Sequence, residues 1–218
     1  MKSTLFLPLF ALLPSLSLAS PTQGPEWTNL LADDSTALWK SPKHEEVTPA
    51  WSLQEGVLHL DKSGQKRGGH LVTKKHYFDF ELRFEWKISP GGNSGVKYRT
   101  SNLLGFEFQV IDDQSLAARK DSHRAGSLYD LVPSPADKKL KPVGEWNQSR
   151  IIAKGTQIEH WLNGTKVVEI PLKGKAWDER FTKSKYRKIP NFAGQPGPIL
   201  LQDHGNDVWF RHLFIKEL

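Results

Sequence analysis

The sequence contains no cysteine among its 218 residues. Disulfide bonds and thiol chemistry are therefore excluded, and the folded state must rely on its packed core. The composition allows such a core, because 38% of the residues are hydrophobic and 11% are aromatic. Beyond residue 19, no apolar run approaches the roughly 18 residues that a membrane-spanning helix needs, so we expect no membrane span in the mature chain.

The first 19 residues have the features of a secretory signal peptide. Lys2 supplies a positive start, residues 5–13 form a short apolar segment, and Ser17-Leu18-Ala19 is a small-x-small cleavage sequence. A buried N-terminal helix is the alternative interpretation. The sequence thus predicts a signal peptide at 1–19, a flexible tail at 20–26 and a single domain at 27–218, in an exported protein that is periplasmic or secreted.

Motifs for nucleic acids and nucleotides are also absent. The formal charge is +6, but the basic residues are either scattered or grouped at 183–188. The chain has no nucleic-acid-binding, Walker, dinucleotide-binding or Gly-x-Ser-x-Gly motif. We therefore expect a solvated basic surface and no nucleic-acid partner.

Alternation of apolar and polar residues dominates the stretch from Phe78 to Asp113. Successive side chains of a strand point to opposite faces of its sheet. The even-numbered residues of 78–88 are apolar and the odd-numbered ones are charged, and 96–99 and 105–110 alternate in the same way. If these strands are neighbours, they form one sheet with an aromatic inner face and a polar outer face. Functional residues are expected on that outer face.

The rest of the chain shows the pattern of an antiparallel β-sandwich. Strand-like segments, among them Ala125–Val132, recur between turn signals such as Asn163-Gly164. Only the segment near 176–185 is typical of a helix, and no βαβ alternation occurs. We expect an all-β, antiparallel jelly-roll sandwich with one short helix.

The acidic residues of the central stretch do not form an ordinary glycosidase pair within one strand. Glu81 and Glu85 are four residues apart, which is about 13 Å in an extended strand. The two carboxylates of a typical glycosidase lie about 5 to 9.5 Å apart. A cross-strand pair of Glu85 with Glu107 remains possible if their strands are neighbours.

Two polar side chains follow in the same stretch. Asn93 lies in the segment Gly91–Gly95, which fits a hairpin loop but could also project the amide over the end of the sheet. Arg99 comes from the next strand. It could pair with Glu107 or Glu85, or it could hold a sugar hydroxyl or a developing oxyanion.

The segment Gln202–Gly205 brings a histidine between the last two predicted strands. His204 could act as a general base, because an unperturbed histidine titrates near neutrality, and Asp203 could assist it. An Asx turn beside an exposed histidine is the alternative. The histidines show no ligand-like spacing, and the adjacent pair Asp112-Asp113 is weak support for calcium, so we expect no cofactor or metal.

Several short motifs occur in a fixed order along the chain. They are Phe80-Glu-Leu-Arg-Phe-Glu-Trp, Gly91-Gly-Asn-Ser-Gly-Val-Lys-Tyr-Arg, Gly105-Phe-Glu-Phe-Gln-Val-Ile-Asp, Leu128-Tyr-Asp-Leu, Gly144-Glu-Trp-Asn, Trp161-Leu-Asn-Gly and Leu201-Gln-Asp-His-Gly. Together they resemble the 3-keto-disaccharide hydrolase domain family, over nearly all of residues 27–218. Asp130 departs from the pattern, since a glycine is common there.

The resemblance implies a concanavalin-like jelly roll and the cleavage of glycosides that are oxidised at C3. A C3 ketone acidifies the proton on C2, so one base can start the elimination of the C1 oxygen, and water can then add to the unsaturated product. This route needs a base, a donor for the enolate oxygen and an acid for the leaving group. It does not need two carboxylates at glycosidase spacing.

We hypothesise that Glu107 or His204 is the base and that Arg99 and Asn93 stabilise the enolate. The motivation is the polar face that Arg99, Glu107 and Gln109 are predicted to share, together with the Gln202–Gly205 segment. The residues predicted to bind the sugar are Asn93, Gln109, Tyr129, Gln202, Asp203 and Glu85. The expected partner is a 3-keto-sugar or another carbohydrate.

Two other functions remain open from the sequence. A non-catalytic carbohydrate-binding module would suit the same fold, although exposed aromatic residues on the polar face would then be expected. A conventional glycoside hydrolase would need two carboxylates at the appropriate cross-strand distance.

Overall fold

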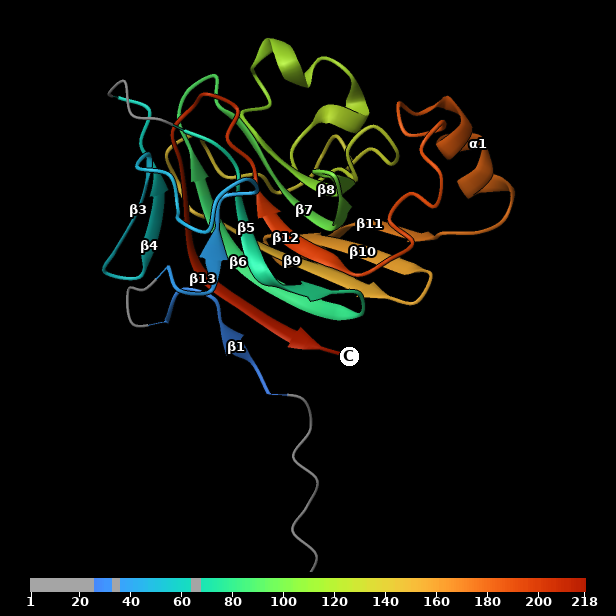
Figure 1. Cartoon of the computed structure of the whole chain (residues 1–218). Helices are drawn as coiled ribbons and strands as arrows, with labels where there is room; N and C mark the ends of the chain where they lie inside the picture. Colours follow the sequence, from blue (N-terminus) through green and yellow to red (C-terminus); the bar gives the residue numbers. More distant parts are fainter. Residues whose placement is uncertain (1–25, 33–35, 64–67) are drawn as a thin grey trace, which may run out of the picture.

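The computed structural model describes residues 26–32, 36–63 and 68–218, which fold into two antiparallel sheets packed face to face (Figure 1). The predicted signal peptide at 1–19 lies outside the described residues, as does the predicted tail up to residue 25. The eight-stranded sheet has the order β11 (Thr165–Pro171), β10 (Gln157–Leu162), β9 (Asn147–Lys154), β6 (Phe80–Ile88), β13 (Val208–Glu217), β4 (Val57–Leu60) and β3 (Trp51–Gln54), and β1 (Thr28–Asn29) pairs with β13. The five-stranded sheet has the order β2 (Trp39–Lys40), β5 (Leu71–Tyr77), β12 (Gly197–Leu201), β7 (Asn93–Ser101) and β8 (Leu104–Ile111). The predicted all-β antiparallel jelly roll is thus confirmed.

The core lies between the two sheets and is built from the apolar faces of the alternating strands. Phe80 of β6 meets Tyr98 of β7 edge to face, with ring centres 5.7 Å apart. Phe84 of β6 meets Phe108 of β8 in the same way at 5.3 Å. Aromatic pairs in this geometry add about 1 kcal/mol each beyond the area that they bury. The four rings are at most 2% exposed, so the packing of β6 against β7 and β8 joins the two layers.

The same contacts correct one prediction. The strands at 78–88, 96–99 and 105–110 do not share a sheet, because β6 belongs to the eight-stranded sheet whereas β7 and β8 belong to the five-stranded one. Alternation shows which face of a strand is buried. It does not show whether the next strand lies beside that strand or across the core from it.

The long connection between β8 and β9 differs from its predicted form. Residues 125–132 form turns with two isolated bridges, from Leu128 to Phe108 and from Leu128 to Val132, and no regular strand. The segment nevertheless lies against the edge strand β8, since the Tyr129 amide donates to the Glu107 carbonyl at 3.0 Å. Two short 3-10 helices, η2 (Leu116–Ala118) and η3 (Asp121–His123), precede it.

The predicted helix is confirmed as α1 (Lys175–Lys183). The rings of Trp177 and Phe181 stack on one side of this helix, with their centres 5.6 Å apart. Trp177 also meets Phe106 of β8 edge to face, with ring centres 6.0 Å apart. In Figure 1 the helix (orange) and the β8–β9 connection (yellow-green) stand together beside β7 and β8. Within the described residues, no helix is long and apolar enough to cross a membrane.

A buried histidine ties the eight-stranded sheet to the β8–β9 connection. His160 of β10 is completely buried, and its Nδ1 lies 3.1 Å from the Gly126 carbonyl oxygen, which can only accept a hydrogen bond. Nδ1 therefore carries the proton, and Nε2 accepts from the Tyr98 hydroxyl at 2.8 Å. Burial lowers the pKa of His160 to about 4. The neutral imidazole thus fixes the loop that carries Tyr129.

This buried imidazole should make stability depend on pH. Between pH 6.5 and about 4, the unfolded chain binds a proton at His160 and the folded chain does not, so the free energy of unfolding falls as the pH falls. The loss amounts to about 3 kcal/mol across that window. We predict that His160→Gln lowers stability at pH 7 but flattens its decline toward pH 4, as measured by urea unfolding at a series of pH values. An unchanged slope would contradict this assignment.

Candidate active site on the five-stranded sheet

The polar face of the five-stranded sheet centres on a lysine and a glutamate from neighbouring strands. Lys97 of β7 lies directly opposite Glu107 of β8, and Lys97 Nζ is 3.6 Å from Glu107 Oε2. Both side chains are at least 90% buried. The Glu107 carboxylate folds over Gly95, where an added Cβ would stand only 2.4 Å from Oε1. The absence of a side chain at residue 95 therefore makes room for the carboxylate.

The burial of Glu107 changes its acidity. Desolvation raises the pKa of this carboxyl, and the positive charges of Lys97 and Lys185 oppose that rise only in part. A carboxylate with a raised pKa binds a proton more strongly than an exposed one does. Glu107 therefore has the properties of a general base that operates closer to neutrality than an ordinary glutamate.

Two buried amides beside this pair have unused acceptor atoms. Gln109 Nε2 donates to Asn93 Oδ1 at 2.9 Å, but no donor among the described residues reaches Gln109 Oε1. The same holds for Oε1 of Gln202, whose backbone amide donates to the Gly95 carbonyl at 2.9 Å. Leaving a buried carbonyl oxygen without a partner costs about 1 to 3 kcal/mol. Hydroxyl groups of a bound sugar would supply the missing donors.

A tyrosine and a second lysine form the wall of the site next to β8. Burial raises the pKa of the Tyr129 phenol, and the nearby negative charges of Glu107 and Asp130 raise it further. Lys185 Nζ lies 4.2 Å from the centre of the Tyr129 ring. Burial lowers the pKa of Lys185, and the charge of Glu107 partly offsets this. The ring of His123 stacks on the ring of Tyr129, with the ring centres 4.3 Å apart.

The loop after β12 reaches the site through a histidine that the sequence did not single out. His70, just before β5, accepts a hydrogen bond at Nδ1 from the Asp203 amide at 3.1 Å, so its Nε2 carries the proton. Burial lowers the pKa of His70, and the charge of Lys97 lowers it further. The Asp203 carboxylate accepts from the Gly69 amide at 2.7 Å, and therefore anchors the loop. His204 is exposed in the same loop.

Arg99 does not take part in this site, contrary to the predicted shared face. The β7–β8 register shifts between Tyr98 and Ser101, and Arg99 has a φ of 48°, so the alternation breaks at this residue. Its guanidinium donates to the carbonyls of Phe78 at 2.8 Å and Gly155 at 2.9 Å. Arg99 Nη2 also forms an ion pair with Asp79 Oδ1 at 3.1 Å, and the Arg99 side chain is 1% exposed. These contacts hold two loops together.

Glu85 is also absent from the site. It lies on β6, in the other sheet, where its carboxylate accepts from Arg211 Nε at 2.7 Å and Gln148 Nε2 at 3.2 Å. The possible cross-strand pair of Glu85 with Glu107 is therefore wrong. Of the remaining predicted residues, the structure brings Asn93, Gln109 and Tyr129 close to Glu107, and it places Gln202 across β7 from them.

Lys97 and Lys185 are the contributors that sequence reasoning left without a role. For Lys97, the alternation of apolar and polar residues already predicted a place on the polar face of its strand. For Lys185, no sequence pattern predicted a place in the site, because its position depends on how the loop after α1 folds. The backbone amide of Lys185 donates to Asp130 Oδ2 at 2.7 Å, which brings that loop to the wall of the site.

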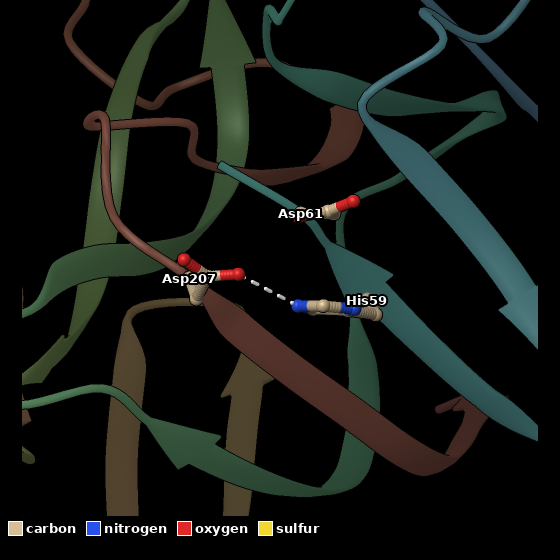
Figure 2. A group of neighbouring side chains, drawn as sticks. All are labelled: His59, Asp61 and Asp207. Atoms are coloured by element: carbon tan, nitrogen blue, oxygen red, sulfur yellow. Dashed lines mark hydrogen bonds and ion pairs between the residues drawn. The ribbon is translucent and has the colours of Figure 1, made fainter. Parts of the chain in front are cut away.

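One group of described side chains has the ligand types and proximity of a cation site. His59, Asp61 and Asp207 offer ligand atoms that lie within 4.8 Å of one another (Figure 2). His59 Nε2 already lies 2.9 Å from Asp207 Oδ1. The Asp112 carboxylate instead accepts from the Gly91 and Gln114 amides, and it stabilises the loops around it.

A jelly-roll sandwich whose polar face carries a buried acid, two amines and unpaired amides defines a carbohydrate-active protein. Residues 26–216 match the model of the 3-keto-alpha-glucoside-1,2-lyase-like domain, and the chain belongs to this family. It is 30% identical to a 3-keto-disaccharide hydrolase from Bacteroides thetaiotaomicron over 216 residues, covering 83% of this chain and 74% of that protein.

Solved structures agree with the assignment. A protein from Parabacteroides distasonis described as a glycosyl hydrolase has a TM-score of 0.79 and 28% identity, covering 88% of this chain and 94% of that chain. A β-agarase B crystallised with agaro-octaose has a TM-score of 0.53 and 13% identity, covering 94% of this chain and 97% of that chain, and shows the likeness of fold alone. The family and its relatives identify this chain as a glycoside-cleaving enzyme.

The structural role of Arg99 can be tested directly. Arg99→Met should lower the free energy of unfolding by about 3 kcal/mol, because it removes the side-chain donor to the Phe78 and Gly155 carbonyls and one of the two donors to Asp79 Oδ1. Arg119→Met, at an exposed arginine, should change it by less than about 0.5 kcal/mol. Urea unfolding of both variants is the measurement. A stable Arg99→Met protein that has lost glycoside cleavage would restore Arg99 to the active site.

Proposed function

We propose that this enzyme cleaves glycosides that carry a ketone at C3, by elimination and rehydration. Glu107 takes the proton from C2, and the electron pair of that C–H bond forms a C2=C3 double bond while the carbonyl π pair moves to the C3 oxygen. When the C3 ketone re-forms, the C2=C3 pair becomes the C1=C2 double bond and the C1–O bond breaks. The leaving oxygen takes a proton from the Tyr129 phenol. Water then adds at C1 and returns a proton to Tyr129, while Glu107 returns its proton to C2. The net result is hydrolysis.

Positive charge beside the base suits this chemistry. The enolate that forms when C2 loses its proton places negative charge on the C3 oxygen, and Lys97 is the cation nearest to Glu107. Asn93 is held by Gln109 in the same row and offers its amide as a second donor. Lys97 thus takes the role that the sequence had suggested for Arg99.

The observation that carries the proposal is the Glu107 carboxyl, which is buried, has a raised pKa, pairs with the Lys97 amine and lies near two buried amide oxygens to which no described residue donates. Elimination next to a ketone needs one base, whereas ordinary glycoside hydrolysis needs two carboxylates at a defined spacing. The name of the Bacteroides relative supports the same substrate class.

Removal of the base is the first test. We predict that Glu107→Gln lowers kcat on 3-keto-trehalose or another 3-keto-glucoside by about 100-fold or more, because a positioned base contributes on that scale. Product formation is followed by chromatography, and substrate binding by calorimetry should persist. Glu145→Gln, at an exposed glutamate, is the matched control. Full turnover by Glu107→Gln would contradict the proposal. Turnover of ordinary disaccharides, which lack the C3 ketone, would contradict it as well.

The pH dependence gives a second test. Glu107 is inactive while protonated, so kcat/KM should rise with pH along a limb that lies above the ordinary glutamate pKa of 4.5. Lys97 holds the Glu107 pKa down, and Lys97→Met should therefore shift this limb to higher pH as well as lower the plateau. A limb that stays in place in Lys97→Met would show that Glu107 is not the titrating base.

A further inference from the structure

A cavity of about 580 Å³ opens on the outer face of the eight-stranded sheet, on the opposite layer from the candidate active site. Its lining residues come from β10, β9, β6 and β13 and from the turn after β10. These four strands are neighbours in the sheet (Figure 1). Pockets for small ligands have volumes of about 300 to 1,000 Å³. The side chains that the argument uses are Arg83, Glu85, Gln148, Arg150, Trp161 and His212. We refer to this cavity as the outer groove.

A β-bulge produces the outer groove. Arg211 of β13 pairs with Glu85 of β6, but the next paired residue is Phe214, opposite Arg83, so β13 carries one extra residue between these positions. His212 lies in that irregular segment with a φ of 49° and an exposed side chain. Bulges bend a strand and redirect its side chains. Here the bend leaves a hollow beside β6, with His212 at its rim.

Two arginines face each other across this hollow. Arg83 of β6 is the direct cross-strand partner of Arg150 of β9. Like charges in such a position destabilise a sheet unless something compensates them. The compensation is one carboxylate, that of Glu81, which lies 2.8 Å from Arg83 Nη2 and 3.6 Å from Arg150 Nη1. Lys216 also approaches Glu81 at 3.8 Å, so three cations share one acid.

Each guanidinium lies over the ring of a tryptophan. The Arg83 guanidinium lies 4.4 Å from the ring centre of Trp27, and that of Arg150 lies 4.2 Å from the ring centre of Trp161. Such contacts stabilise a cation over an aromatic face. Arg83 remains 53% exposed and Arg150 31%. Glu81 Oε1 accepts from Arg83 Nε at 2.9 Å and Nη2 at 2.8 Å, whereas Arg150 Nη1 lies 3.6 Å from it, so both guanidiniums keep N–H groups that Glu81 does not use.

The other wall of the outer groove limits which anion can bind. Burial alone would raise the pKa of Glu85, but hydrogen bonds from Arg211 and His212 lower it overall, so Glu85 is a carboxylate at neutral pH. A polyanion would be repelled by that charge. Glu85 and the amide of Gln148 instead suit hydroxyl groups, which can donate to one and accept from the other.

We propose that the outer groove binds an acid-bearing saccharide. Its single anionic substituent, a carboxylate or a sulfate ester, contacts the N–H groups of Arg83 and Arg150 that Glu81 leaves unused. Its hydroxyl groups contact Glu85 and Gln148, and its ring lies beside Trp161. The site anchors the enzyme to acidic glycan through the layer opposite the reaction centre, and it does not depend on the chemistry proposed for Glu107.

Calorimetry on the full chain tests this binding. A cellotriose that carries one glucuronic acid unit and a monosulfated disaccharide serve as probes, with cellotriose as the neutral comparison and sodium sulfate as the bare anion. At least one acidic saccharide should bind at least tenfold more tightly than cellotriose and than sulfate. Arg83→Gln and Arg150→Gln should each weaken that binding about tenfold or more, because each removes a charged donor to the anion. Arg119→Gln, at an exposed arginine of another face, should leave it unchanged.

Each other outcome overturns the proposal. Equal binding of cellotriose would show that the anionic group is not recognised, and equal binding of sulfate would mean an adventitious ion only. Unchanged affinity in both Gln variants would place the acidic saccharide elsewhere. Absence of binding by both acidic probes would leave the outer groove without this ligand. Turnover of a 3-keto-glucoside by the two variants, measured in parallel, keeps these outcomes separate from any failure of the mechanism.

Discussion

The packing of the aromatic face of β6 against β7 and β8 is the constraint on which the rest of the structure depends. Phe80 and Phe84 cross the core to Tyr98 and Phe108, and these contacts fix the distance and register between the two sheets. With the apolar faces turned inward, each sheet must direct its polar residues outward. The candidate active site and the outer groove lie on these two polar faces, one on each layer.

Burial gives the two polar faces different properties. On the five-stranded sheet, loops cover Glu107 and Lys97, so the carboxyl keeps a raised pKa in spite of its neighbouring cations. On the eight-stranded sheet, Arg83 and Arg150 remain partly open to water and are held by tryptophans. A charge that is desolvated becomes a reactive acid or base, whereas a charge that stays hydrated on a rigid support is suited to recognition. The same alternation of residues thus places a buried ion pair on the outer face of one layer and partly exposed cations on that of the other.

Several residues with catalytic types have structural roles here. Arg99 joins two loops, and Asp203 anchors the loop after β12. His160 is a neutral imidazole that links the eight-stranded sheet to the β8–β9 connection by a hydrogen bond. Their hydrogen-bonding groups are used by backbone groups and neighbouring side chains. Gln109 and Gln202 differ, because each is buried with a side-chain oxygen to which no described residue donates. These two oxygens are the unused acceptors of the candidate site.

The sequence by itself determined the all-β class, most strand positions, the helix near 176–185, the family and the polar alternation that contains Lys97, Glu107 and Gln109. These features are local, since the period of two and the turn residues act within a few positions of the chain. Only the tertiary structure decided that β6 lies across the core from β8, that a register shift turns Arg99 away, and that Lys185 and His70 reach the site. Those outcomes depend on strand pairing, bulges and loop contacts between residues far apart in sequence, which a local pattern does not encode.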